Sequence, residues 1–191
     1  MDYPGQYKTL ILNAIHNIDL NKVGQVIQIF KAARAQGRRI FVCGNGGSDS
    51  MASQFLCDIV KSASFNHSSR FRILALSDQM PKVGSVQGEH EKARIFVEQL
   101  KNFAEPEDVL MGICTSGNSP NVVNAIQYAS WIGCRTIGIT GCDGGDVARL
   151  AELAIQVPAT HIGSIEDVHM VICHMIGYYF VDTEKAPEQG V

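Results

Sequence analysis

The first 36 residues carry two apolar stripes at helical spacing. The first stripe consists of Leu10, Ile11, Ala14, Ile15 and Ile18. The second begins after Asn21 and ends near Gly37, a residue type that commonly follows a helix. We therefore expect two amphipathic helices within residues 1–37. The apolar faces of these helices could either cover a sheet or form an interface with another subunit.

From residue 39 onward, short apolar runs alternate with helical patterns. The strand-like runs are 39–43, 71–76, 108–114, 135–140 and 154–157. The helical patterns are 48–63, 91–103, 120–132, a short helix ending near 153, and 164–181. Because the strands are apolar throughout and separated by helices, the order predicts a doubly wound parallel five-stranded sheet with helices on both faces. The chain then reads as a single domain with a helical pair (1–37), an α/β core (38–183) and a polar tail (184–191).

Composition narrows the class of partner. The 191 residues are 46% hydrophobic and 18% charged, which is a globular composition. Sixteen Lys and Arg against nineteen Asp and Glu give a net charge of −3, so no global field attracts nucleic acid or an anionic membrane. We expect neither as a direct partner.

The cysteines and the N-terminus bear on the compartment. Six cysteines include no C-x-x-C pair, and Cys43, Cys114 and Cys173 lie inside apolar runs. They are predicted to be small buried hydrophobic residues in a reducing compartment. The N-terminus has no apolar signal region, and no run approaches the ~20 residues that span a bilayer. We therefore expect a soluble cytoplasmic protein.

Two loops follow strands and begin helices, where ligands bind in such sheets. The first, Gly44–Ser48, is glycine-rich, but the dinucleotide fingerprint would need a third glycine where Asp49 stands. No Gly-Lys-Ser/Thr follows either, so no nucleotide cofactor is expected. From this loop alone, an ordinary glycine turn and a loop that lets a ligand approach the backbone are equally supported.

The second loop has a more specific pattern. Thr115, Ser116 and Ser119 place three hydroxyls between a buried strand and the start of a helix. Backbone N–H groups at a helix start favour an anion, and hydroxyls add neutral donors. Ser119 alone could be a helix cap, but three hydroxyls together with Gly117 favour a phosphate cradle.

Four separated motifs carry a family resemblance that covers essentially the whole chain. They are Cys43–Ser48, Leu110–Ser119, Ile139–Gly145 and Glu166–His174. They resemble the sugar isomerase (SIS) family, and most of all its phosphoheptose isomerase branch. The resemblance implies interconversion of sedoheptulose 7-phosphate and D-glycero-D-manno-heptose 7-phosphate. It also implies a homotetramer with active sites at subunit contacts, and a zinc ion in many members.

The resemblance also assigns residues. It places the sugar phosphate on Asn45, Gly46, Gly47, Ser48, Glu89, Thr115, Ser116 and Ser119, the hydroxyls of the second loop holding the phosphate. It places acid–base residues and a metal ion on the helix after the first loop and on the last helix. By resemblance Asp58 is the base, His174 the acid and Glu89 a reserve carboxylate, while zinc would take Gln54, Asp58, Glu166 and His174.

The residues support this grouping independently. Gln54 and Asp58 are four apart and share a helix face, and Glu166 and His174 are two turns apart on another helix. If the two faces meet, two carboxylates, an imidazole and an amide suit a divalent cation or acid–base work. The alternative is ordinary: a solvated Asp58 and a core His174.

The chain departs from the family pattern at several positions. Gln54 replaces a His, Gly88-Glu89 an Asn-Asp pair, Cys114 a Ser, Ser164 an Arg and Glu166 a Gln. These departures leave two alternatives open. One is a non-catalytic SIS protein that binds phosphosugars or regulates through protein contacts, and the other is an isomerase or epimerase for a different phosphosugar.

Overall fold

The computed structural model describes residues 2–65, 69–77 and 92–183. The helices are α1 (Tyr3–His16), α2 (Leu20–Ala35), α3 (Gly47–Ser62), α6 (Ile95–Phe103), α7 (Pro120–Trp131), α8 (Gly145–Leu150) and α9 (Ile162–Thr183). The strands are β1 (Arg39–Cys43), β2 (Arg72–Ala75), β3 (Val109–Cys114), β4 (Arg135–Thr140) and β5 (Leu153–Gln156). They form one five-stranded sheet in the order β2-β1-β3-β4-β5, and every pairing is parallel.

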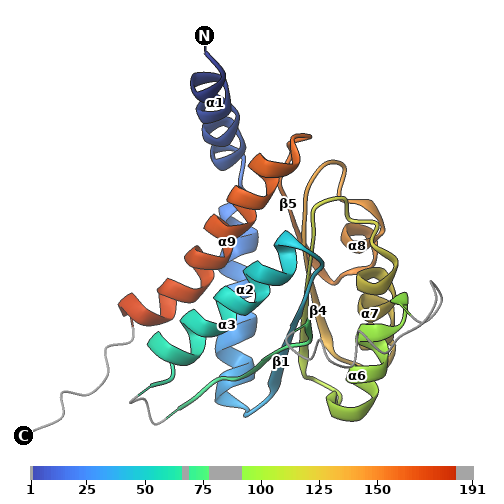
Figure 1. Cartoon of the computed structure of the whole chain (residues 1–191). Helices are drawn as coiled ribbons and strands as arrows, with labels where there is room; N and C mark the ends of the chain where they lie inside the picture. The colour runs from blue at the N-terminus through green and yellow to red at the C-terminus, as the bar shows by residue number, and fades with distance from the viewer. Residues whose placement is uncertain (1, 66–68, 78–91, 184–191) are drawn as a thin grey trace, which may run out of the picture.

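Helices cover both faces of this sheet, which confirms the predicted doubly wound fold. Helices α2, α3 and α9 lie on one face, and α6, α7 and α8 lie on the other (Figure 1). Helix α1 projects away from the sheet and contacts the start of α9, where the Tyr7 hydroxyl donates to Asp167 Oδ2 at 2.8 Å. The two N-terminal helices therefore have different roles, because α2 covers the sheet and α1 leaves much of its surface open.

Strands β1 and β3 are neighbours, but the chain turns to opposite faces of the sheet after each of them. After β1 the chain continues into α3 on one face, and after β3 it continues into α7 on the other (Figure 1). This is the switch point of a doubly wound sheet, where the carboxyl ends of the strands open a crevice. The two loops singled out in the sequence, residues 44–48 and 115–119, therefore lie side by side.

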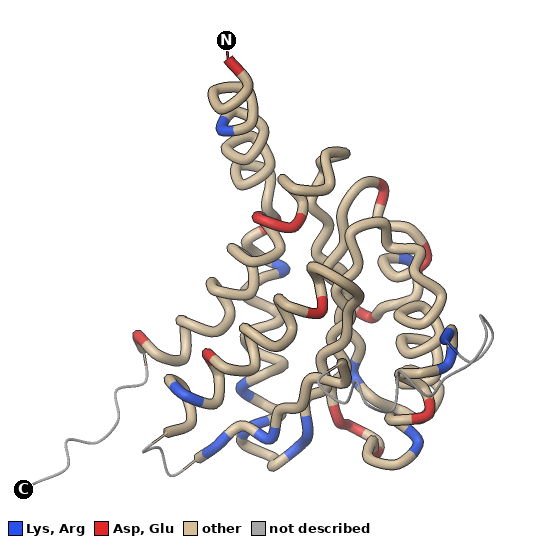
Figure 2. The backbone as a smooth tube through the Cα atoms, viewed as in Figure 1, with Lys and Arg blue, Asp and Glu red and all other residues tan. Residues whose placement is uncertain are grey.

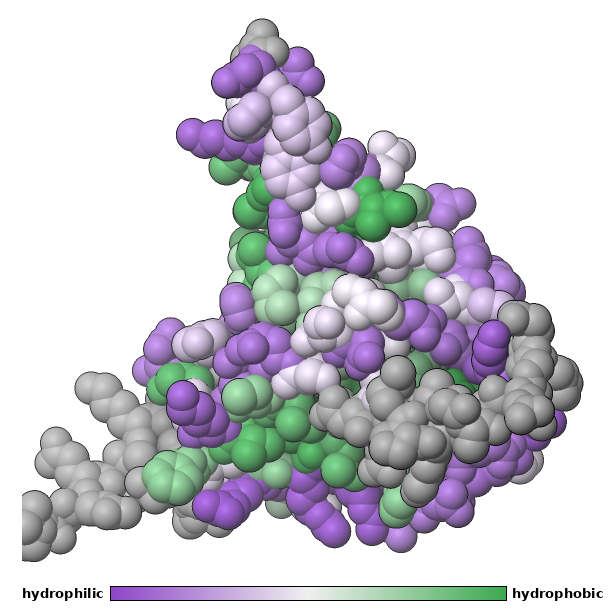
Figure 3. Space-filling view, in the orientation of Figure 1, coloured by the Kyte–Doolittle hydropathy of each residue, from purple (hydrophilic) through white to green (hydrophobic). Residues whose placement is uncertain are grey.

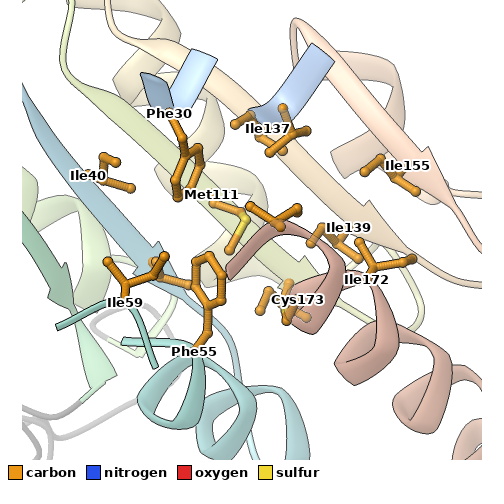
Figure 4. Close-up of a cluster of buried hydrophobic side chains, with 14 of the residues drawn as sticks. Phe30, Ile40, Phe55, Ile59, Met111, Ile137, Ile139, Ile155, Ile172 and Cys173 are labelled. Carbon is orange, nitrogen blue, oxygen red and sulfur yellow. The ribbon is translucent and has the colours of Figure 1, made fainter. Parts of the chain in front are cut away.

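The larger core fills the space between the sheet and α2, α3 and α9 (Figure 4). Phe30 from α2 meets Phe55 from α3 edge-on, with ring centroids 5.8 Å apart. Ile172 and Cys173 from α9 and Ile139 from β4 complete this layer and are fully buried. Each such aliphatic or aromatic side chain contributes about 1.5–3 kcal/mol of burial free energy, so α3 and α9 are fixed firmly against the sheet.

One expectation from the sequence needs correction, and two others can be checked. The short helix α8 ends at Leu150, not near 153, because the Glu152 amide donates to Thr136 Oγ1 and Leu153 pairs with Ile137 of β4. The residue type of Trp131 predicts a place in the core or an interface, and its side chain is 80% exposed, which excludes the core. Cys43, Cys114 and Cys173 are buried free thiols, as predicted.

No helix within the described ranges is long and apolar enough to cross a membrane.

His169 of α9 gives the fold a pH dependence. Its side chain is fully buried, and in the described part of the chain neither ring nitrogen has a hydrogen-bond partner of normal geometry. Burial lowers the pKa of His169 from 6.5 to about 4, and the nearby Thr140 carbonyl opposes this only weakly. As pH falls below 6.5, His169 becomes protonated in the unfolded chain but stays neutral in the folded chain. Stability is therefore lost through that range, by about 3 kcal/mol once the pH is below 4.

We predict that His169→Leu reduces the loss of stability at acidic pH. Urea unfolding at pH 7 and near pH 4.5 should show a smaller drop in the free energy of unfolding for His169→Leu than for the wild type. His16→Leu on α1, outside the core, serves as the control and should keep the wild-type pH dependence. An unchanged pH slope in His169→Leu would contradict this account.

Candidate functional site

The first loop is drawn tightly into the start of α3. Gly46 begins the helix with φ +55°, a conformation that glycine adopts without strain. A Cβ on Gly44 would lie 2.7 Å from Ser48 Cβ, so the loop closes directly on a serine that is itself 3% exposed. Asn45 points across to α7, where it exchanges two hydrogen bonds with Asn121 at 2.9 and 2.8 Å.

The hydroxyls of the second loop are arranged as donors. Ser116 Oγ accepts from the Asn118 amide at 3.2 Å, and Ser119 Oγ accepts from Cys114 Sγ at 3.2 Å. Ser116 Oγ also lies 3.7 Å from Cys114 Sγ, where either atom can be the donor, and each hydroxyl can turn its hydrogen toward an incoming acceptor. Ser119 occupies the N-cap position of α7, yet its side chain makes no capping bond within the described structure. This disfavours the simple cap interpretation and favours the cradle.

The third glycine-rich motif, residues 141–145, supports the second loop from beneath. Gly117 has φ +68°, and a Cβ there would overlap the Gly144 carbonyl. The Val147 amide donates to the Gly117 carbonyl at 2.9 Å, and the Asp146 amide donates to Asn118 Oδ1 at 3.0 Å. The hydroxyl loop is therefore held by α8 as well as by β3 and α7.

The charge around the loops is neutral to acidic. Residues 44–48, 115–119 and 141–145 contain no Lys or Arg. Figure 2 shows Lys and Arg gathered mainly toward the opposite end of the molecule, at the amino ends of the strands. An anion at the second loop would therefore be held by hydroxyls and helix N–H groups instead of by cationic side chains.

Three of the four residues expected on α3 and α9 come together. Gln54 Nε2 donates to Asp58 Oδ1 at 3.0 Å, and His174 Nε2 lies 3.6 Å from Asp58 Oδ2. The Asp58 side chain is 11% exposed, and its Oδ2 has no hydrogen-bond partner among the described residues. The His174 side chain is 45% exposed and stands edge-on to the Tyr178 ring. A buried carboxylate oxygen thus faces an accessible imidazole.

Glu166 lies elsewhere. A Cβ on Gly47 would overlap Glu166 Oε1, so this carboxylate rests on the first turn of α3. His174 is two turns further along α9, about 12 Å by helical rise. Within the described ranges, no group of three or more His, Cys, Asp or Glu side chains is placed to hold a metal ion. Asp58, His174 and one amide do not complete a zinc site among the described residues of one chain, and the expectation of zinc stays a prediction.

Two other expected positions need comment. Glu89 and Gly88 lie outside the described residues. Ser164, where the family pattern has Arg, is fully buried and donates from Oγ to the His161 carbonyl at 2.8 Å. It therefore has a structural role at the start of α9. Sequence reasoning missed Asn121 and the role of Asn118, although both stand in the Gly-Asn-Ser-Pro-Asn run that continues the hydroxyl loop.

Comparisons with known proteins agree with this architecture. Residues 5–141 match the family model described as the SIS domain. The chain is 31% identical over 162 residues to a phosphoheptose isomerase of Geotalea daltonii, covering 81% of this chain and 80% of that protein. It is 35% identical over 161 residues to a phosphoheptose isomerase of Citrifermentans bemidjiense, covering 81% and 78%.

Solved structures show the same fold. A phosphoheptose isomerase from Francisella tularensis superposes with a TM-score of 0.83 at 22% identity, over 95% of each chain. One from Neisseria gonorrhoeae gives a TM-score of 0.84 at 23% identity, over 94% of this chain and 96% of that one. The fold and the hydroxyl loop thus define a sugar isomerase domain. The chain belongs to the SIS domain family and, within it, to the phosphoheptose isomerase branch.

The packing of Gly117 predicts that this position accepts no side chain. Gly117→Ala would strain the backbone at positive φ and displace the Gly144 carbonyl, which should cost about 2–5 kcal/mol of stability. It should also weaken binding of sugar phosphates, since the second loop must move. Thermal unfolding and calorimetry measure the two effects.

Gly24 is the matched control. It lies in α2, and a Cβ added there would meet nothing within 4 Å, so Gly24→Ala should raise stability by about 1 kcal/mol through helix propensity. A Gly117→Ala protein as stable as the wild type would contradict the tight packing between the loops.

Proposed function

We propose that this protein is an aldose–ketose isomerase of a heptose phosphate, interconverting sedoheptulose 7-phosphate and D-glycero-D-manno-heptose 7-phosphate. One observation carries the proposal: Asp58 Oδ2, buried and without a partner in the described structure, faces His174 Nε2 at 3.6 Å. The isomerase relatives favour this function over the non-catalytic alternative, because a binding protein has no use for an acid–base pair. The same pair could serve another phosphosugar, and the test below therefore names the substrate.

The second loop suits the phosphate end of such a substrate. A phosphate monoester dianion presents acceptor oxygens only, and Ser116 and Ser119 offer O–H hydrogens whose oxygens are already engaged. Thr115 adds a third hydroxyl, and the start of α7 adds backbone N–H groups and a partial positive charge. The loop therefore binds charge without carrying it.

Asp58 and His174 suit the carbon end. In the ketose-to-aldose direction, Asp58 removes a proton from C1 while His174 delivers one to the carbonyl oxygen on C2, giving an enediol. The hydroxyl on C1 then loses its proton, C2 gains one, and the aldose results. Gln54 holds Asp58 Oδ1 and thereby turns Oδ2 toward His174, which fixes the orientation of the proposed base. No step in this sequence is assigned to a metal ion.

The two ends lie well apart in one chain. Asp58 follows Gly47 by eleven residues, about 16 Å along α3. We propose that a second copy brings the pair of one subunit toward the loops of another, as in the homotetramer that the resemblance implies. Exposed Tyr3, Leu10 and Leu12 on the projecting α1 support such an assembly, and apolar surface along α1 is visible in Figure 3. Six free cysteines support a reducing, cytoplasmic location.

Removing either member of the pair should abolish most turnover. We predict that Asp58→Asn and His174→Gln each lower kcat on sedoheptulose 7-phosphate by about 10²–10⁴-fold, the usual contribution of a general acid or base, with KM changed little. Appearance of the aldose measures the reaction.

The matched controls are Asp182→Asn near the end of α9 and His16→Gln on α1, both exposed and outside the site. They should retain wild-type kcat. A wild-type protein that leaves sedoheptulose 7-phosphate unchanged would overturn the proposed reaction, and a wild-type rate in Asp58→Asn would overturn the assignment of the base.

A shared site predicts complementation between two inactive variants. The double variant Thr115→Ala/Ser116→Ala should lose affinity for the phosphate, and Asp58→Asn should lose chemistry. Co-expression of the two should restore up to about a quarter of wild-type activity, because random mixing leaves that fraction of interfacial sites intact. A mixture no more active than its components would show that each chain builds its site alone.

A further inference from the structure

A pair of asparagine amides joins the two loops of the site. Asn45 Nδ2 donates to Asn121 Oδ1 at 2.9 Å, and Asn121 Nδ2 donates back to Asn45 Oδ1 at 2.8 Å. The two residues are 76 apart in the sequence, Asn45 in the first loop and Asn121 in the first turn of α7, and the helices that follow the two loops cover opposite faces of the sheet. The pair therefore spans the crevice at the switch point.

Asn121 is the more rigid partner. It follows Pro120 in the first turn of α7, and its Oδ1 also accepts from the Val122 amide at 3.0 Å. One side-chain oxygen thus serves its own helix and the opposite loop at once. With its oxygen fixed in this way, the amide nitrogen of Asn121 can point only toward Asn45, and the orientation of the Asn45 amide follows from it.

This pairing changes the role expected of Asn45. Asn45 keeps one N–H hydrogen and one oxygen lone pair beyond the two shared bonds, whereas Asn121 keeps only an N–H hydrogen, because its oxygen also accepts from the Val122 amide. Asn45 can still contact a sugar hydroxyl, but only from the position that Asn121 dictates. The distance between the glycine loop and the hydroxyl loop is set by the same bonds.

We propose that Asn121 is a positioning residue that orients Asn45 and fixes the spacing between the sugar-binding and phosphate-binding loops. This inference rests on the proposed function for its substrate. A sugar phosphate must engage both loops together, whereas inorganic phosphate needs only the hydroxyl loop. Loss of the pair should therefore weaken the binding of the sugar phosphate and leave the binding of inorganic phosphate unchanged.

A double-mutant cycle tests the proposal. The variants are Asn45→Ala, Asn121→Ala and the two combined, each assayed for kcat/KM on sedoheptulose 7-phosphate. Binding of that sugar phosphate and of inorganic phosphate is measured by calorimetry. We expect each single variant to lower kcat/KM by about tenfold, and the double variant to lose no more than the worse single variant, because contacting residues do not act additively. Inorganic phosphate affinity should change by less than about twofold, since the Asn121 side chain acts on Asn45, which serves the sugar and not the phosphate.

Asn124→Ala is the matched control. Asn124 stands one turn further along α7, and its amide donates to the Ala93 carbonyl at 2.8 Å, away from the crevice. It should keep wild-type kcat/KM. An Asn121→Ala protein that behaves like Asn124→Ala would overturn the proposal.

Losses that multiply to about a hundredfold in the double variant would also overturn it, because Asn121 would then act through Val122 alone. If the wild type binds the sugar phosphate but does not convert it, the proposed reaction is wrong. The double-mutant cycle is then evaluated from dissociation constants instead of kcat/KM. Non-multiplying losses there still support the pair. Absence of any sugar-phosphate binding would overturn both proposals.

Discussion

The site depends on one constraint: after the parallel neighbours β1 and β3, the chain crosses to opposite faces of the sheet. Because the two strands are parallel neighbours, their carboxyl ends meet at one edge of the sheet. Because α3 and α7 leave that edge toward opposite faces, two helix N-termini converge on one crevice without competing for space. Gly44 then lets the first loop close on Ser48, and Gly117 lets the second loop approach the Gly144 carbonyl. Every proposed ligand contact of the loops follows from that arrangement.

The Asp58–His174 pair depends on a different constraint, the packing of α3 against α9. Phe55 lies against Gly177, where a Cβ would stand 3.5 Å from the Phe55 ring, so the two helices approach closely. Their axes run in the same direction, since Gly47 meets Glu166 and Asp58 meets His174. Parallel packing therefore keeps Glu166 at one end of the helix pair and the acid–base residues toward the other. The family resemblance alone could not show this separation.

Much of the fold was predictable because each strand is an unbroken apolar run and each helix carries an apolar stripe. The convergence of Gln54, Asp58 and His174 followed from helical spacing once two faces were assumed to meet. Other features needed coordinates. Helix α8 ends early because of a side-chain bond from Thr136, which no local pattern records. The residue type of Trp131 leaves both the core and an interface open, and only its exposure excludes the core. The Asn45–Asn121 pair joins residues whose sequence separation carries no signal.

The distribution of charge favours the second loop over the first as the place for the proposed phosphate contact. The first turn of α3 already holds Asp49, and the Glu166 carboxylate rests on Gly47, so the partial positive charge of that helix end is already met. The first turn of α7 contains no acidic residue, and its neighbours are neutral hydroxyls. In the proposed function, a dianion would be repelled at α3, whereas at α7 it would meet the serine hydroxyls and the Asn121 N–H, because the Val122 amide is already bonded to Asn121 Oδ1. The Glu166 carboxylate would then face the neutral, hydroxyl-rich part of the sugar and could accept hydrogen bonds from its O–H groups. The orientation of the substrate thus follows from which helix end remains uncompensated.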